Sequence, residues 1–182
     1  MYPEVKSYGD FVSKHNSLQS ETSSLQDSIT FIQNETNREK TNLSSLEAAV
    51  KSKNDQITEL EEYVTTIQKK GIAEYIRTLD KRIENAKSFE ERMILKEKKE
   101  KALGDQNHTV LKNGEVVKET KKELVARRTE QLEILKASRD EDLGKISRSK
   151  DQIAQNERMV ESLSKDLEEG MQKLQELRIA FS

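Results

Sequence analysis

Residues 110–117 read VLKNGEVV, two short apolar runs on either side of Asn113-Gly114. An Asn-Gly pair between apolar runs is the strongest local signal for a two-residue β-hairpin turn. The expected cross-strand pairs are Lys112–Glu115, Leu111–Val116 and Val110–Val117, all of favourable types. The alternative is that Asn-Gly ends a loop, since isolated two-stranded hairpins are only marginally stable. In both cases the chain reverses here, and we expect the last helix to begin near Val117.

On both sides of this turn, apolar residues recur at alternating spacings of three and four. The pattern runs over residues 11–67 and again over 125–181, and each run covers 57 residues. Such spacing, sustained over eight heptads, is typical of a coiled coil. Leu143 and Met171 each follow a weak seam position, and we expect them to cover part of the seam. The equal lengths of the two arms suggest that they pair with each other.

An antiparallel pairing requires the numbers of facing seam residues to add up to a constant. A sum of 192 gives nine all-apolar layers out of seventeen and sets Phe11 against Phe181, whereas sums of 185 and 199 give six each. At 192, Lys53 faces Arg139, one like-charge layer whose long stems can carry the charges outward. The alternative, a parallel homodimer, would stack four charged seam residues on their own copies. These counts favour the intramolecular hairpin.

The segment between the arms has helical patterns of its own. Apolar spacing predicts an amphipathic helix over 72–87. Ser88 and Glu91 have the spacing of a capping box and should start a second helix, with Gly104 as its expected C-terminal stop. Residues 105–109 are polar and are expected to form a loop. The predicted organisation is a tail over 1–10, a first arm over 11–67, a head over 68–124 and a second arm over 125–182.

Composition limits the fold and the compartment. Hydrophobic residues make up 32% and charged residues 36%, against typical values of roughly 45–50% and about 25%. This predicts an all-α protein, a long antiparallel coiled-coil hairpin with a small helical head and a short β-hairpin at 109–118. There is no cysteine, so no disulfide is available. No apolar segment resembles a signal peptide or approaches the roughly 20 residues that span a bilayer, so we expect an intracellular, cytoplasmic protein.

Charge is unevenly distributed along the chain. Residues 68–128 carry 17 basic and 11 acidic side chains, a net of +6, whereas residues 1–67 have a net of −5 and residues 129–182 a net of −3. Lys and Arg can neutralise the phosphates or carboxylates of an acidic partner. The alternative is that lysines interleaved with glutamates simply make a soluble helix surface. The candidate partner-binding residues of this basic head are Lys96, Lys98, Lys99, Lys101, Lys118, Lys121, Lys122, Arg127 and Arg128.

No pattern in the sequence indicates catalysis. The six glycines are scattered singly, so there is no glycine-rich phosphate loop, and the two histidines are far apart in the expected hairpin. We therefore expect no enzyme activity, no cofactor and no metal. The leading hypothesis is a scaffold, tether or adaptor that binds protein partners through its coiled-coil surface, or a second copy as a homo-oligomer. The rival hypotheses are a ribosome- or RNA-associated factor and a chaperone-like or membrane-tethering coil.

Residues 77–103, RTLDKRIENAKSFEERMILKEKKEKAL, resemble a block in a family of long coiled-coil proteins. These are proteins similar to the yeast nuclear segregation (brefeldin-resistance) protein and related archaeal coiled-coil proteins. The shared pattern is a helix with Arg82-Ile83-Glu84, a break at Ser88 and a lysine-rich helix. The resemblance implies an association with ribosomes and messenger RNA, which a basic head would suit.

Overall fold

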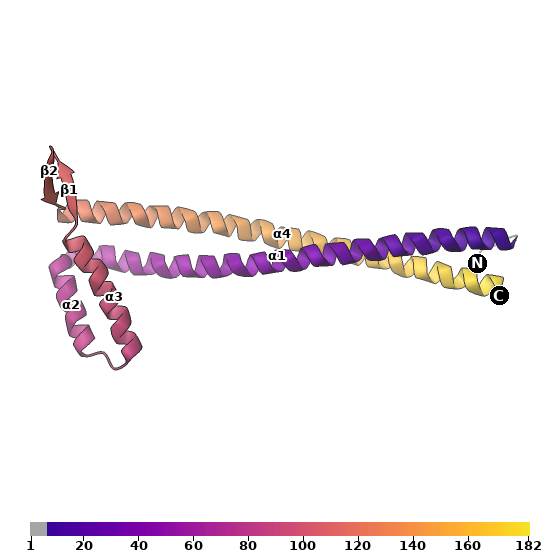
Figure 1. Cartoon of the computed structure of the whole chain (residues 1–182), viewed down its shortest axis with the longest axis horizontal. Coiled ribbons are helices and arrows are strands. Elements are labelled where there is room, and N and C mark those ends of the chain that lie inside the picture. The colour runs from indigo at the N-terminus through magenta and orange to yellow at the C-terminus, as the bar shows by residue number, and fades with distance from the viewer. Residues whose placement is uncertain (1–6) are drawn as a thin grey trace. The chain divides into compact units, whose positions relative to one another are not determined.

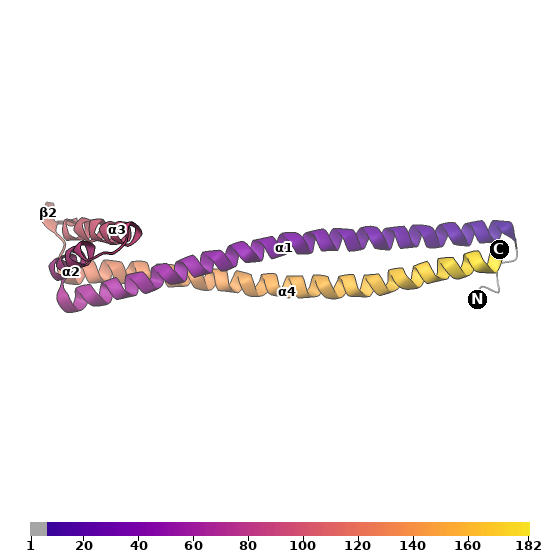
Figure 2. The same ribbon diagram turned by 90° about the horizontal axis from the view of Figure 1, so that it is seen from below.

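The computed structural model describes residues 7–182 of the chain. Within this range the chain forms four helices and one two-stranded sheet. In chain order these are α1 (Tyr8–Lys70), α2 (Ile72–Glu84), α3 (Phe89–Gln106), β1 (Thr109–Lys112), β2 (Glu115–Lys118) and α4 (Lys121–Phe181). The fold is all-α, and α1 packs against α4 of the same chain (Figures 1 and 2). The predicted helical hairpin is therefore confirmed.

The described residues divide into two compact units, one from residues 7–48 and 142–182 and the other from residues 49–141. In the first unit, the rings of Phe11 and Phe181 stack with their centroids 4.5 Å apart. A Cβ added to Gly170 would lie 2.8 Å from Thr22 Cγ2, so the two backbones approach closely there. The residue numbers of both pairs add up to 192, and the predicted register holds in this unit.

The charged side chains that flank this seam follow the same register. Lys40 Nζ lies 3.0 Å from Glu157 Oε1, and Lys150 Nζ lies 4.0 Å from Glu47 Oε1. A slip of one heptad in one direction would set Lys40 opposite Lys150, and a slip in the other direction would set Glu47 opposite Glu157. Each exposed pair contributes only about 0.2–1 kcal/mol. Because both slips replace attraction by repulsion, the flank nevertheless specifies the register.

The second unit shows the same pairing of α1 with α4. Lys136 Nζ lies 3.0 Å from Glu61 Oε1, in the same heptad relation as the flanking pairs of the first unit. In the layer where Lys53 faces Arg139, the two side chains turn away from each other. Lys53 Nζ donates to Ser138 Oγ at 2.9 Å, and Arg139 donates to Asn54 Oδ1 of α1 at 3.3 Å. Both long side chains thus carry their charges out of the seam to polar partners, as predicted.

The expected contribution of Leu143 and Met171 to the seam is wrong. Both side chains are exposed, whereas the seam position just before Leu143, Asp142, is buried. The reason is the register: at a sum of 192 the true seam positions face α1 even where they are polar or lack a side chain. The residue that follows each of them then points to the flank.

The helices begin and end where the local chemistry dictates. At the start of α1, Ser7 Oγ accepts a hydrogen bond from the backbone N–H of Asp10 at 3.2 Å, which satisfies one free donor of the first turn. Gly71 has φ 82° and ψ 161°, a backbone conformation that glycine adopts without steric cost, and it lets the chain leave α1 and enter α2. At the start of α3, Ser88 Oγ accepts from Glu91 N at 3.1 Å, so the predicted cap is confirmed.

Three boundaries differ from the prediction. The helix predicted over 72–87 ends at Glu84. Gly104 does not end α3, which continues to Gln106, because the next residue, Asp105, is buried among partners from other elements. The loop predicted over 105–109 is confined to residues 107–108, and residue 109 already begins β1. The last helix begins at Lys121 instead of Val117, because residues 115–118 form β2.

The β-hairpin forms with the predicted register. Its pairs are Thr109–Lys118, Val110–Val117, Leu111–Val116 and Lys112–Glu115. Asn113 and Gly114 have φ 51° and 81°, the pair of left-handed residues that a type I′ turn requires. The backbone N–H of Glu119 donates to His108 O at 3.0 Å and extends the ladder by one bond.

Candidate functional site

A buried carboxylate, Asp105, lies at the centre of the second unit. It sits in the last turn of α3, and its side chain is 4% exposed. Tyr63 of α1 donates its hydroxyl to Oδ2 at 2.5 Å, Arg128 Nε donates to Oδ2 at 2.8 Å, and Arg127 Nη2 donates to Oδ1 at 3.0 Å. One carboxylate thus ties together the end of α1, the end of α3 and the start of α4.

A second buried carboxylate, Glu119, lies between β2 and α4. Arg127 donates to it in a bidentate pair, Nε to Oε2 at 2.8 Å and Nη2 to Oε1 at 2.9 Å. His108 Nδ1 lies 3.3 Å from Oε2. Lys112 of β1 pairs with Glu123 in the first turn of α4. These contacts anchor the hairpin to the helix that follows it.

The pKa values in this cluster follow from burial and hydrogen bonding. Burial alone would raise the pKa of Asp105, but the hydrogen bonds from Arg128, Tyr63 and Arg127 outweigh it and hold the pKa below its ordinary value. Hydrogen bonds from Arg127 likewise lower the pKa of Glu119. Burial, together with the Asp105 carboxylate, raises the pKa of the Tyr63 hydroxyl. The cluster therefore holds the two carboxylates in their charged forms, and the guanidinium groups of Arg127 and Arg128 donate hydrogen bonds to them.

Such an arrangement stabilises structure and offers little for chemistry. The carboxylate of Asp105 accepts four hydrogen bonds from three residues, so it is a poor proton acceptor at neutral pH. Among the residues that the structure describes, no group of three or more His, Cys, Asp or Glu side chains is placed to hold a metal ion.

A hollow of about 550 Å³ lies beside the cluster, between α1, α3 and α4 of the same unit. Its walls are largely apolar and include Leu60, Leu135 and the exposed Ile134. The rings of Tyr63 and Tyr75 meet edge to face at its side, with centroids 5.1 Å apart. Burial raises the pKa of Tyr75, so both tyrosines are neutral at physiological pH.

Five of the nine candidate cations are engaged in ion pairs within the unit. Arg127 and Arg128 turn inward to the buried carboxylates. The other three pairs are Lys98–Glu59 at 3.9 Å, Lys99–Asp80 at 2.6 Å and Lys101–Glu97 at 3.7 Å. These five cations contribute to packing and to local charge balance, and they are less available to a partner.

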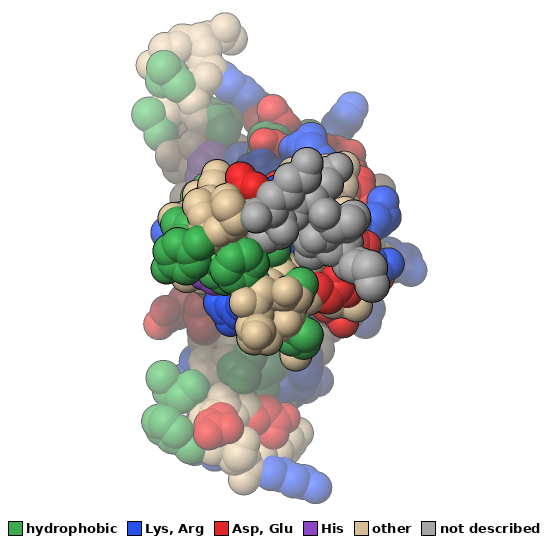
Figure 3. Space-filling view, turned by 90° about the vertical axis from the view of Figure 1, so that its right-hand side faces the viewer, with side chains coloured by type: hydrophobic (Ala, Val, Ile, Leu, Met, Phe, Trp, Pro, Cys, Tyr) green, Lys and Arg blue, Asp and Glu red, His purple; other side chains and the backbone are tan. Residues whose placement is uncertain are grey.

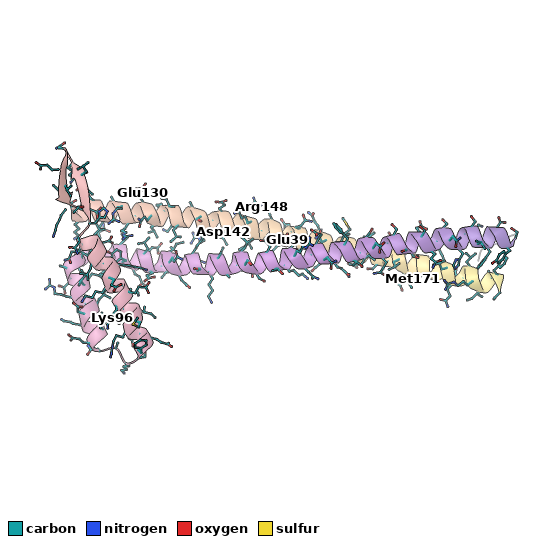
Figure 4. All side chains as sticks on the ribbon, in the orientation of Figure 1. Glu39, Lys96, Glu130, Asp142, Arg148 and Met171 are labelled. Carbon is teal, nitrogen blue, oxygen red and sulfur yellow. The ribbon has the colours of Figure 1, made fainter. Side chains whose placement is uncertain are left out.

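The other four, Lys96, Lys118, Lys121 and Lys122, are exposed. Within residues 7–182 none of them has an ion-pair partner. Lys96, labelled in Figure 4, lies on α3, in the projection that α2 and α3 form. Lys118 ends β2, and Lys121 and Lys122 begin α4. The structure thus selects a smaller set of available cations from the basic segment.

The buried cluster was not found by the sequence analysis. Asp105 follows a glycine in a polar segment. The sequence positions of the other cluster members give no indication that these residues contact one another; the members are Tyr63, Glu119, Arg127 and Arg128. A weak signal was present, because two adjacent arginines at the start of a long helix require counter-charges if either occupies a seam position.

Comparisons with protein-family models, with curated proteins and with solved structures found no match. None of the described helices is both long enough and apolar enough to cross a membrane.

Proposed function

We propose that this protein is a non-enzymatic coiled-coil adaptor, which binds protein partners along the α1–α4 surface and an acidic partner at its head. The observation that carries the proposal is the sorting of the head cations. Five of nine take part in ion pairs within the unit, and the other four are exposed lysines without an ion-pair partner within residues 7–182. Cations left unpaired on a folded surface are the ones that can attract an acidic partner.

The α1–α4 surface of the first unit supports the other half of the proposal. Phe31 of α1 and Met159 of α4 are both exposed. Phe31 borders a shallow hollow of about 220 Å³, which is also lined by Glu35 of α1 and Asn156 of α4. Met159 lies one turn beyond Asn156 on α4. Large apolar side chains beside a groove are the kind of anchor that a partner helix uses.

Retention of the full chain on immobilised heparin tests the head. Replacing Lys96, Lys118, Lys121 and Lys122 by Gln should lower the salt concentration of elution clearly. The matched control replaces four exposed arm cations that have no ion-pair partner within residues 7–182, Lys51, Arg148, Arg158 and Lys173, by Gln and removes the same charge. We expect the control to elute close to the wild type. If both variants lowered the salt concentration of elution equally, the head lysines would bind the anion no better than arm cations, and the proposal would be wrong.

A ribosome- or RNA-associated role is the second candidate, and the same four lysines favour it. Phosphate contacts release counterions, so binding to single-stranded RNA should weaken steeply with salt, with a log–log slope of about −0.7 per contact. The head variant should reduce that slope by up to about three, while the arm variant leaves it unchanged. RNA binding that does not change with salt would exclude this role.

A further inference from the structure

The β-hairpin presents exposed apolar side chains on the face that is turned away from α4. Strand residues alternate between two faces, so Val110, Lys112 and their partners share one face. That face lies toward α4, where Lys112 pairs with Glu123. Leu111 and Val116 lie on the other face, and each is 72% exposed. A hairpin under no further constraint would carry polar residues at these outward positions.

The N-terminal end of α3 also carries exposed apolar side chains. Phe89 in the first turn is 75% exposed, and Met93, one turn along the same helix face, is also exposed. Ile94 beside Met93 is a third exposed apolar side chain. None of the three is among the buried residues of α3, which are Leu95, Ala102 and Asp105.

These two groups lie on the same side of the second unit. Figure 3 shows hydrophobic side chains gathered at the left edge of both projections, the β-hairpin above and the α2–α3 pair below. We name the group of Phe89, Met93, Ile94, Leu111 and Val116 the apolar head face.

Exposed lysines accompany both parts of this face. Lys118 lies two residues after Val116 on β2, so its side chain shares the outward face of the hairpin. Lys96 lies seven residues after Phe89 on α3, which places it on the same helical stripe. Each apolar group therefore has an unpaired cation beside it.

We propose that the apolar head face binds the surface of an anionic lipid bilayer. The apolar side chains would enter the headgroup region, while Lys96, Lys118, Lys121 and Lys122 would contact the lipid phosphates and carboxylates. The inference rests on the proposed acidic partner of the head and names its class. Binding of this kind lies in the interface and needs no membrane-spanning helix.

Residue chemistry favours lipid over a protein or an RNA. Lysine is depleted at protein–protein interfaces, whereas lysine beside bulky apolar residues is typical of segments that lie on anionic membranes. Single-stranded RNA is held by stacking on aromatic rings, and Phe89 is the one aromatic residue in the apolar head face. The apolar groups also stand on two protruding elements, which a deformable lipid surface can accept more readily than a rigid partner.

Flotation of the full chain with vesicles tests the proposal. The probes are vesicles of phosphatidylcholine alone and of phosphatidylcholine mixed with phosphatidylserine. The first variant carries Leu111→Thr and Val116→Thr, which keep strand propensity, and the second carries Phe89→Gln and Met93→Gln, which suit a helix. All four sites are exposed, so circular dichroism should show folding unchanged. The matched control carries Met171→Gln and Ile179→Gln, two exposed apolar residues of the first unit.

We expect the wild type to float with the phosphatidylserine vesicles and much less with phosphatidylcholine alone. Each head variant should bind about tenfold more weakly or worse, since two apolar side chains no longer leave water, and the control should bind like the wild type. Equal binding to both vesicle types, or an equal loss in the control, would overturn the proposal.

The remaining outcomes separate this inference from the proposed function. If the chain binds heparin through its head lysines but floats with neither vesicle, lipid binding is wrong and the acidic-partner role stands. If it binds neither heparin nor vesicles, both are wrong. If the head variants instead change the mass of the protein in sedimentation, the apolar head face joins two copies of this chain, and lipid binding is likewise wrong.

Discussion

Asp105→Asn should loosen the whole second unit, although the substitution removes no volume. The carboxylate is 4% exposed and accepts hydrogen bonds from Tyr63, Arg127 and Arg128. Asparagine keeps one oxygen acceptor and replaces the other by an amide that donates. At least one guanidinium group then faces a donor, and Arg128 loses the charge that compensates its partial burial.

The magnitude follows from how deeply each partner is buried. Removing one member of a fully buried ion pair costs roughly 3–5 kcal/mol. The side chains of Arg127 and Arg128 are 26% and 24% exposed, so water recovers part of this loss. We therefore expect a loss of about 2–3 kcal/mol in the free energy of unfolding of this unit. For a unit of this size the melting temperature should fall by roughly 10–20 °C.

Hydrogen exchange on the full chain, combined with thermal melting followed by circular dichroism, measures this effect locally. Exchange should accelerate over the end of α3, the β-hairpin and the start of α4, and should change little in residues 7–48 and 142–182. The control is Glu97→Gln, which removes an exposed pair with Lys101 and should cost under about 0.5 kcal/mol. If Asp105→Asn matched this control, or if exchange rose equally in both units, the carboxylate would not organise the head as argued.

Three further predictions concern the seam and the cluster. Gly170→Ala should destabilise the first unit by about 1 kcal/mol despite a better helix propensity, because the new Cβ meets Thr22, whereas Gly144→Ala, in open space, should stabilise it by up to about 1 kcal/mol in chemical denaturation. Because folding lowers the pKa of Glu119, this residue stabilises the fold fully at pH values above its unfolded pKa, and the stabilisation is lost as the pH falls through its folded pKa. The melting temperature should therefore drop below about pH 4.5, and it should drop less in Glu119→Gln. Glu47→Lys alone should cost about 0.5 kcal/mol, and adding Lys150→Glu should restore most of it in a double-mutant cycle.

The helical hairpin could be predicted because its information is periodic. Each arm repeats the heptad pattern of apolar residues many times, so a few polar exceptions such as Lys53 do not obscure the pattern. The register was also accessible, since only the sum of 192 sets Phe11 against Phe181 and maximises apolar layers. The flanking charges agree independently, which explains why a seam with several polar layers still pairs in one way.

The head could be predicted only where its signals were local. The Ser88 cap and the Asn113-Gly114 turn depend on neighbours within a few residues, and both are confirmed. The end of α3 depends on Asp105 finding partners 22 and 23 residues later in the chain. A glycine is a weak stop signal when the next residue gains several buried hydrogen bonds by staying helical, and so Gly104 misled the prediction.

Net charge was the coarsest signal, because it counts structural and available cations alike. Arg127 and Lys118 contribute equally to the basic segment, yet one is held by two buried carboxylates and the other is exposed. The distinction needed the fold, since an ion pair between distant residues leaves no trace in composition. The residues VLKNGEVV, by contrast, were sufficient to predict the β-hairpin and its register. The hairpin turns one face toward α4 and leaves Leu111 and Val116 exposed on the other face, and the proposed contact with lipid would give this second apolar pair a role.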